Sequence, residues 1–267
     1  MKSRAASTIV AAVPVISSEP FVVQQHKVPL FAKMAGTAFL VVLVPIYWHT
    51  YGLTNFLWFC DAALVLTVAG MWLENSLLIS MCSVGILLPQ CLWLADFGSH
   101  LLGIRLVGLT GYMFDPALSL FTRGLSLFHG WLPLLLIWLL LRLGYDKRAL
   151  PAWTCLAAVL MFVCYFFTPP AGTLLANSNT PINLNYLYGF NDRQPQAWIN
   201  QNLYVMLWFG ALWLVAFLPT HLVLRKIFTA PRPAAGQWPH RAHMPSPPIH
   251  LRKLPLTRTE ASAQPHN

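Results

Sequence analysis

Two apolar stretches of the sequence carry polar side chains of the kinds that do chemistry. Cys60 and Asp61 are adjacent near the start of one stretch, and Arg123, Ser126 and His129 lie in another. Ionisable groups inside membrane-spanning segments are rare and costly, so by default they mark a functional site. A thiol and an imidazole are the minimum parts for nucleophilic catalysis, because the imidazole can take the proton of the thiol.

The catalytic hypothesis makes a geometric demand. A thiol in apolar surroundings is inert without a base, so Cys60 and His129 must lie within hydrogen-bonding reach, directly or through one water. Asp61 has two interpretations: it orients His129 as a third group, or it forms a buried ion pair with Arg123. Ser126 shares a helical face with Arg123 and His129, because steps of three residues keep side chains on one face. The plain structural alternative is interhelical hydrogen bonding by Ser126 and a satisfied core imidazole.

The composition excludes an ordinary soluble domain. Of the 267 residues, 57% are hydrophobic and 9% are charged, whereas a soluble domain carries about 25% charged residues. We expect an all-α polytopic membrane protein, a bundle of six transmembrane helices, each near the roughly 20 residues that a hydrocarbon core requires. The predicted spans are residues 31–48, 55–73, 76–94, 117–141, 150–168 and 198–224. The apolar residues 100–109 are too few to cross and are predicted to be re-entrant or interfacial.

The Lys and Arg residues predict the orientation, since they gather on the cytoplasmic side of a membrane. With both termini cytoplasmic, fourteen of the seventeen lie inside. The chain then divides into a flexible N-terminal tail (1–29), a transmembrane domain (30–227) and a disordered, basic, Pro-rich tail (228–267). This last tail can rest on an anionic lipid surface or simply be solvated. Nucleic acid is not an expected partner, because the basic residues lie beside spans and in tails.

Counting from the predicted inner boundaries places the thiol and the imidazole at similar depths. Cys60 lies roughly 9 Å and His129 roughly 10 Å inside the outer edge of the hydrocarbon core, at 1.5 Å per residue. Arg123 then lies at the outer interface, where a cation can meet lipid phosphate. The loop over residues 169–197 is long for a compact bundle. Its Asn185 and Tyr186 are predicted to hydrogen-bond a polar headgroup, or merely to form a turn.

The cysteine pattern argues against other chemistries. All five cysteines fall in apolar segments, with no CxxC pair and no metal-ligand spacing, so we expect no disulfide framework, no metal and no cofactor. Haem or quinone binding would need a pair of axial histidines. His49 and His100 lie near span ends, and neither is obviously paired with His129.

Four short motifs resemble those of the YwaF-like bacterial integral membrane proteins. They are the Cys-bearing stretch FLWFCD at 56–61, FHG at 128–130, LGYD at 143–146 and NYLY at 185–188. The resemblance covers residues 53–219, with Trp58 where the family usually has a His. That family is similar to transmembrane phospholipid acyltransferases and, distantly, to androgen-induced membrane hydrolases. The resemblance implies a nucleophile at Cys60, a base at His129 and a place in the cell membrane, the inner one in bacteria.

Two functions follow from these observations. In the first, the protein is a thiol-dependent lipid acyltransferase or fatty-acyl ester hydrolase with membrane lipids as partners, in which Arg123, Asn185 and Tyr186 hold the headgroup or oxyanion. In the second, it is a non-enzymatic binding or transport protein with a polar intramembrane pocket. Nothing in the sequence sets the oligomeric state.

Overall fold

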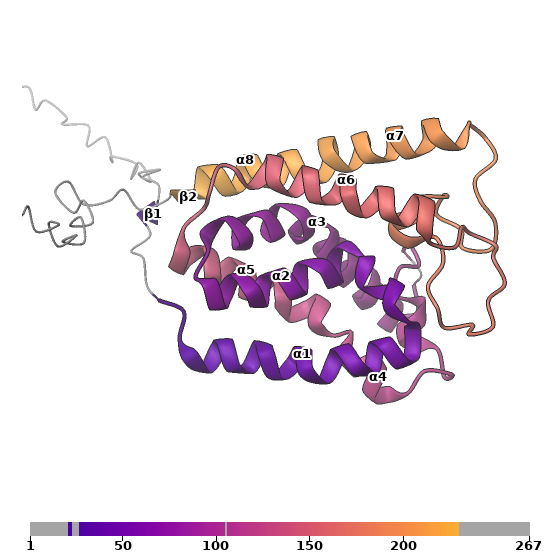
Figure 1. Cartoon of the computed structure of the whole chain (residues 1–267), viewed down its shortest axis with the longest axis horizontal. Coiled ribbons are helices and arrows are strands. Elements are labelled where there is room, and N and C mark those ends of the chain that lie inside the picture. The colour runs from indigo at the N-terminus through magenta and orange to yellow at the C-terminus, as the bar shows by residue number, and fades with distance from the viewer. Residues whose placement is uncertain (1–20, 23–26, 105, 230–267) are drawn as a thin grey trace, which may run out of the picture. The chain divides into compact units, whose positions relative to one another are not determined.

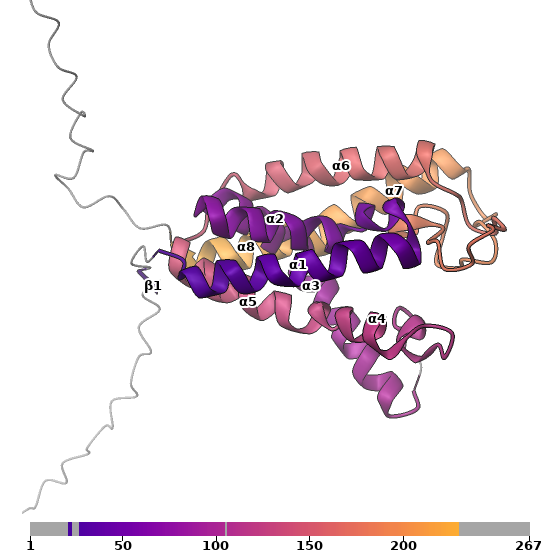
Figure 2. The ribbon, with the colours of Figure 1, turned by 60° about the horizontal axis from the view of Figure 1, so that its bottom comes forward.

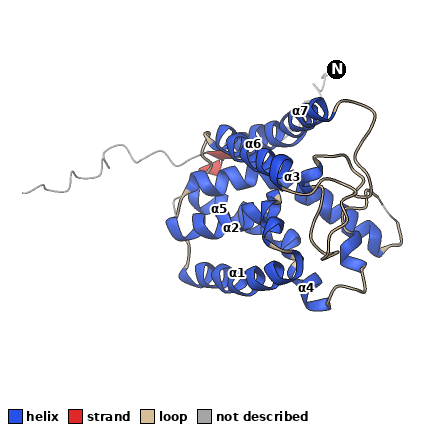
Figure 3. Ribbon diagram, turned by 45° about the vertical axis from the view of Figure 1, so that its right-hand side comes forward, coloured by secondary structure: helices blue, strands red, loops and turns tan. Residues whose placement is uncertain are grey.

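The computed structural model of the chain describes residues 21–22, 27–104 and 106–229. The two predicted tails, 1–29 and 228–267, therefore fall largely outside the described residues. At their edges a two-residue strand, β1 (Phe21–Val22), pairs in parallel with another, β2 (Phe228–Thr229). All other regular structure in the described part is helical, as Figure 3 shows.

Long apolar helices dominate the chain. Five helical stretches are long and apolar enough to cross a membrane: Leu30–Tyr51, Ser76–Leu101, Leu120–Leu143, Ala149–Phe167 and Gln201–Ile227. The apolar α2 (Phe59–Leu73) has 15 residues, fewer than a span needs, and follows the 3-10 helix η1 (Leu53–Leu57). The prediction of an all-α, multi-pass chain is confirmed at this level. The count of six spans and the cytoplasmic termini stay predictions.

Two of the five stretches are not uniform helices. The third consists of α4 (Leu120–Leu125) and α5 (Phe128–Leu143), separated by a tight turn. The last consists of α7 (Gln201–Leu212), a π-helical turn η4 (Trp213–Phe217) and α8 (Leu218–Ile227). The remaining elements are α1 (Leu30–Tyr51), α3 (Ser76–Leu101), α6 (Ala149–Phe167), η2 (Gly111–Phe114) and η3 (Leu184–Tyr186).

The predicted end of the third span at residue 94 is wrong, because α3 continues through Asp96 to Leu101. The carboxylate of Asp96 is almost fully buried, with 1% of the residue exposed. It accepts backbone N–H groups from Val107, Gly108 and Thr110 at 2.7–2.9 Å, and the Thr110 hydroxyl at 2.8 Å. A charge with four donors can remain inside a helix that packs against protein. Asp96 is therefore the anchor of the following loop rather than a helix boundary.

Helix α3 is the centre of the bundle and contacts α2, α5, α6 and α8 (Figure 1). Helix α1 lies along α2, as Figures 1 and 2 both show. The contact between α3 and α6 is close at Gly85, where an added Cβ would lie 1.8 Å from the ring of Trp153. Only glycine lets the indole fill this space, so Gly85 sets the separation of the two helices.

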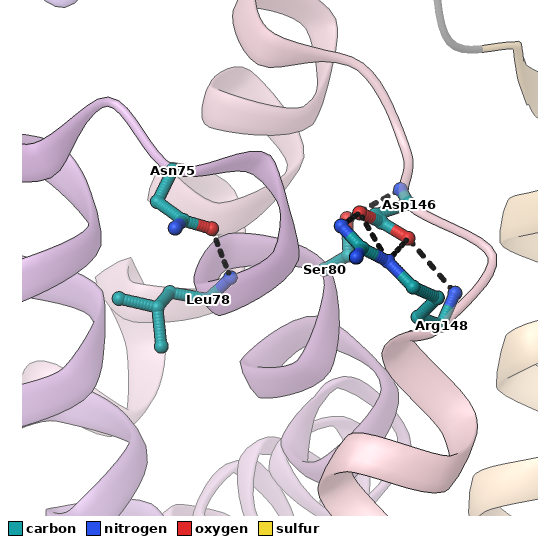
Figure 4. Close-up of polar contacts among 5 residues, drawn as sticks. All are labelled: Asn75, Leu78, Ser80, Asp146 and Arg148. Atoms are coloured by element: carbon teal, nitrogen blue, oxygen red, sulfur yellow. Dashed lines mark hydrogen bonds and ion pairs between the residues drawn. The ribbon is translucent and has the colours of Figure 1, made fainter.

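Hydrogen bonds fix the connections at one end of the bundle (Figure 4). The side chain of Asn75 accepts the backbone N–H of Leu78 at 3.1 Å and so caps the N-terminus of α3. Ser80 of α3 accepts the backbone N–H of Asp146, in the connection between α5 and α6, at 2.9 Å. Arg148 donates to the carboxylate of Asp146, and this hydrogen bond lowers the pKa of Asp146 below its usual range.

Candidate functional site

Cys60 and Asp61 occupy the first turn of α2. The thiol of Cys60 donates to Asp61 Oδ2 at 3.7 Å, a long and weak contact. Only 3% of Asp61 is exposed, and its other oxygen, Oδ1, is buried without a hydrogen-bond partner. A carboxylate gains from the positive end of the helix dipole here. The helix dipole does not replace a hydrogen bond, so Asp61 Oδ1 remains unsatisfied.

Asn185 holds the chain immediately before this turn. Its Oδ1 accepts the backbone N–H of Phe59 at 3.1 Å, and its Nδ2 donates to the carbonyl of Leu57 at 2.9 Å. Its own carbonyl accepts the indole N–H of Trp208 at 2.9 Å. The sequence leaves two roles for Asn185, binding a headgroup or forming a turn, and both ends of its amide are bonded within the protein. Its place in the structure is that of a positioning residue for the start of α2.

Tyr186 follows with its ring 5.6 Å from that of Trp58, measured between centroids. Its carbonyl accepts the hydroxyl of Tyr204 at 3.2 Å. Burial raises the pKa of Tyr186, and Asp192 and then Cys60 raise it further. The phenol therefore lies within electrostatic reach of Cys60 and stays protonated at neutral pH.

His129 is held beside α3 rather than against Cys60. Its Nδ1 donates to the carbonyl of Ser126 at 2.8 Å, which leaves Nε2 as the acceptor nitrogen. Its ring stacks on Trp93, with centroids 4.7 Å apart and an interplanar angle of 18°. Cys60 and His129 share no direct hydrogen bond among those of the described residues. A contact through one water stays a prediction.

Ser126 and Arg123 bind neighbouring segments of the protein. The Ser126 hydroxyl is hydrogen-bonded to the hydroxyl of Tyr47 on α1, at the break between α4 and α5. Arg123 Nη1 donates to the carbonyl of Met113 at 3.1 Å. Within the described ranges the ion pairs are elsewhere, at Lys33–Glu74 and Arg148–Asp146. The interpretation of Asp61 as the ion-pair partner of Arg123 is therefore wrong.

Several other buried polar atoms lack a partner, and sequence reasoning did not single out the residues that carry them. Two of these atoms are Arg142 Nε and Trp153 Nε1, and Arg123 Nε is buried without a partner as well. The other five, on four residues, are the Tyr51 hydroxyl, the Thr54 hydroxyl, both ends of the Gln90 amide and Trp93 Nε1. Gln90 is 2% exposed and Trp93 is 6% exposed. We call these four residues, together with Asp61, the polar cluster. The signal in the sequence was an amide at Gln90 inside an apolar run, three residues before Trp93 on the same helical face.

The hairpin of α2 and α3 brings Asp61 and Gln90 to similar heights. Gly70 of α2 faces Ile79 of α3, since an added Cβ would lie 2.8 Å from Ile79 Cδ1. Asp61 lies nine residues beyond that contact along α2, about 14 Å. Gln90 lies eleven residues beyond it along α3, about 17 Å. The two side chains therefore differ by about 3 Å along the helix axes.

Tyr112 of η2 lies between the start of α2 and the turn that joins α4 to α5. Burial raises the pKa of Tyr112 and the electrostatic effect of Cys60 raises it further, while Ser126 and Trp93 oppose the rise. Asp61 also acts on the phenol. A loop residue that all four side chains influence indicates that α2, α3 and the α4–α5 turn converge here.

The described residues hold no group of three or more His, Cys, Asp or Glu side chains that could bind a metal ion. All five cysteines are free. The arrangement thus offers a thiol, a carboxylate with an open oxygen, and neutral hydrogen-bonding groups. No protein-family model, curated protein or solved structure matches the chain.

Proposed function

We propose that the protein is a multi-pass membrane protein that binds a small hydrogen-bonding ligand in the polar cluster. The observation that carries the proposal is the set of six buried atoms without partners, on Tyr51, Thr54, Asp61, Gln90 and Trp93. Each such atom costs about 1–3 kcal/mol when it is left unsatisfied. Native proteins keep few of these atoms, and those that remain call for an explanation such as an occupant of the site.

The same proposal places the cluster in the membrane. Residues 55–73, within η1 and α2, supply the second span in addition to the five long helical stretches, and both termini lie in the cytoplasm. The cluster then lies in the outer half of a cell membrane, which is the inner membrane if the source is bacterial. Surrounding lipids are the expected partners.

The substitution Gln90→Met tests whether the cluster is built for binding rather than for stability. Removing an unsatisfied amide stabilises the empty protein, because no hydrogen bond is lost and apolar contact is gained. We expect the melting temperature in detergent to rise by about 2–4 °C. Gln196→Met is the matched control. The amide of Gln196 bonds Ile199 and Gln201, so this variant should melt lower than wild type. A lower melting temperature for Gln90→Met would contradict the proposal.

A second candidate function is thiol-dependent acyl transfer or ester hydrolysis at Cys60. It is supported by the position of the thiol in the first turn of α2, where the carboxylate of Asp61 accepts its S–H. The resemblance to the YwaF-like family supports it as well. The thiolate would attack the ester carbonyl to form a thioester and release the alcohol with a proton. Water or a lysolipid would then take the acyl group and restore the thiol.

Acyl trapping separates this candidate from simple binding. Purified protein is incubated with acyl-labelled phospholipid, and label that hydroxylamine releases is sought on Cys60. Cys91, which is exposed, provides the matched control: Cys91→Ala should keep the label and Cys60→Ala should lose it. Equal labelling of both variants would refute the nucleophile.

A further inference from the structure

We propose that the ligand of the polar cluster carries an organic ammonium group with at least one N–H. This inference rests on the proposed function, because it names the chemical class that the cluster would bind. Its first basis is charge. Asp61 is the acidic member of the cluster, and its Oδ1 is buried without a partner.

No cationic side chain of the described residues compensates Asp61. Both ion pairs in this part of the chain join other residues, and Arg123 donates Nη1 to the carbonyl of Met113 while its Nε is buried without a partner. The thiol of Cys60 at 3.7 Å is a weak donor. A buried carboxylate without a counter-charge is costly, so a cationic ligand gains there what an anionic one would lose.

The neutral groups of the cluster favour a ligand that donates hydrogen bonds. The hydroxyls of Tyr51 and Thr54 and the carbonyl oxygen of Gln90 can each accept an N–H, as can Asp61 Oδ1. Four acceptors suit an ammonium that carries hydrogen atoms better than a quaternary one. The remaining donor, Gln90 Nε2, can bind an oxygen elsewhere on the ligand, while Trp93 Nε1 lies beside the phenol of Tyr112.

Aromatic rings near Asp61 add to the attraction for a cation. The rings of Tyr47 and Tyr51 lie 5.2 Å apart at 86°, and both tyrosines are within electrostatic reach of Asp61. Trp93 belongs to the cluster, and Tyr112 is influenced by both Asp61 and Trp93. Aromatic faces attract cations, most strongly where water is excluded. Charge, hydrogen-bond polarity and ring content therefore point to the same ligand class.

Thermal unfolding of the full-length protein in detergent tests the inference. Propylammonium chloride, propan-1-ol and sodium propionate are compared at equal ionic strength. At about ten times its dissociation constant, propylammonium should raise the melting temperature by about 4 °C. Propan-1-ol and propionate should not raise it. Asp61→Asn should abolish the rise. Asp146→Asn is the matched control, because its carboxylate is already bonded to Arg148, and it should keep the rise.

The outcomes separate the inference from the proposed function. Equal shifts with propan-1-ol and propylammonium would overturn the ammonium assignment and leave a binding site. No shift with propylammonium in wild type would also overturn it, while the Gln90→Met result would stand by itself. If Asp61→Asn does not fold, Tyr51→Phe should reduce the propylammonium shift, because the ring stays and one acceptor is lost. An unchanged shift in Tyr51→Phe would count against the inference.

A second experiment distinguishes two sources of the ammonium group, a lipid headgroup and a free amine. Protein in nanodiscs of phosphatidylethanolamine is compared with protein in nanodiscs of phosphatidylglycerol with matched acyl chains. If a lipid headgroup occupies the cluster, the first lipid should raise the melting temperature and should abolish the response to added propylammonium. If the ligand is a free amine, the propylammonium response should be the same in both lipids.

Discussion

The side-chain oxygen of Asn185 accepts the backbone N–H of Phe59 at 3.1 Å, across 126 residues of sequence. The same amide donates to the carbonyl of Leu57, so it bonds the chain on both sides of Trp58. Asn185 itself has a positive φ of 55°, a conformation that Asn tolerates better than most residues. The loop after α6 thereby positions the first turn of α2, where Cys60 and Asp61 lie.

Removing this amide should loosen that turn. Asn185→Ala leaves the N–H of Phe59 and the carbonyl of Leu57 without their partner, and each loss costs about 1–3 kcal/mol. We expect a melting temperature at least about 4 °C below that of wild type in detergent. Asn191→Ala is the control in the same loop, because Asn191 is exposed and, within the described residues, its side chain accepts the N–H of Arg193 two positions along. Equal effects of the two substitutions would argue against a positioning role.

The close contact between α3 and α6 predicts a strong effect at Gly85. A methyl group there would overlap the ring of Trp153, and overpacking of this kind typically costs about 1–3 kcal/mol. Gly85→Ala should therefore lower the melting temperature. Gly98→Ala on the same helix should leave it unchanged or raise it, since nothing lies within 4 Å of an added Cβ and Ala is the better helix former. A fall of similar size in both variants would contradict the packing argument.

The pair of Asp146 and Arg148 predicts a small acid-dependent contribution to stability. The hydrogen bond from Arg148 lowers the pKa of Asp146 in the folded state. The stabilisation is then present above the unfolded value near 3.9 and is lost as the pH falls through the lower folded value. Because Arg148 is exposed, solvent screens the pair and its contribution to stability is small. Wild type should melt slightly above Asp146→Asn at pH 6, and the difference should shrink towards pH 3.

A growing difference towards acid pH would show that another interaction of Asp146 dominates. Arg148→Ala provides the control, because it removes the partner and keeps the carboxylate. It should reproduce the loss at pH 6. It should also keep the hydrogen bond between the backbone of Asp146 and Ser80, which does not involve Arg148.

The helices were largely predictable from the sequence. Apolar runs predicted the first and fifth spans to within three residues of α1 and α6, because length and hydrophobicity decide such segments locally. The break between α4 and α5 was not predictable from the same run. At the break Ser126 is hydrogen-bonded to Tyr47, 79 positions away, and a contact of this kind cannot be inferred from a local apolar run.

The site was less predictable, since its contacts join distant parts of the chain. Asp96 resembles a helix end in the sequence because its four donors lie 11 to 14 residues later, in the loop after α3. His129 resembled a partner for Cys60 because counting residues gives the depth of a side chain along a straight helix. It does not give the direction in which the side chain points. The stacking of His129 on Trp93 decides where the ring lies. Gln90 lies in a predicted span, but only the structure shows that its amide is buried without a hydrogen-bond partner.

Native mass spectrometry of the protein released from mild detergent tests the central claim most directly. With propylammonium added before the measurement, we predict a non-covalent adduct of the mass of the amine on wild type, lost in Asp61→Asn and retained in Asp146→Asn. The absence of any adduct on wild type, or its equal retention in Asp61→Asn, would contradict a ligand bound in the polar cluster.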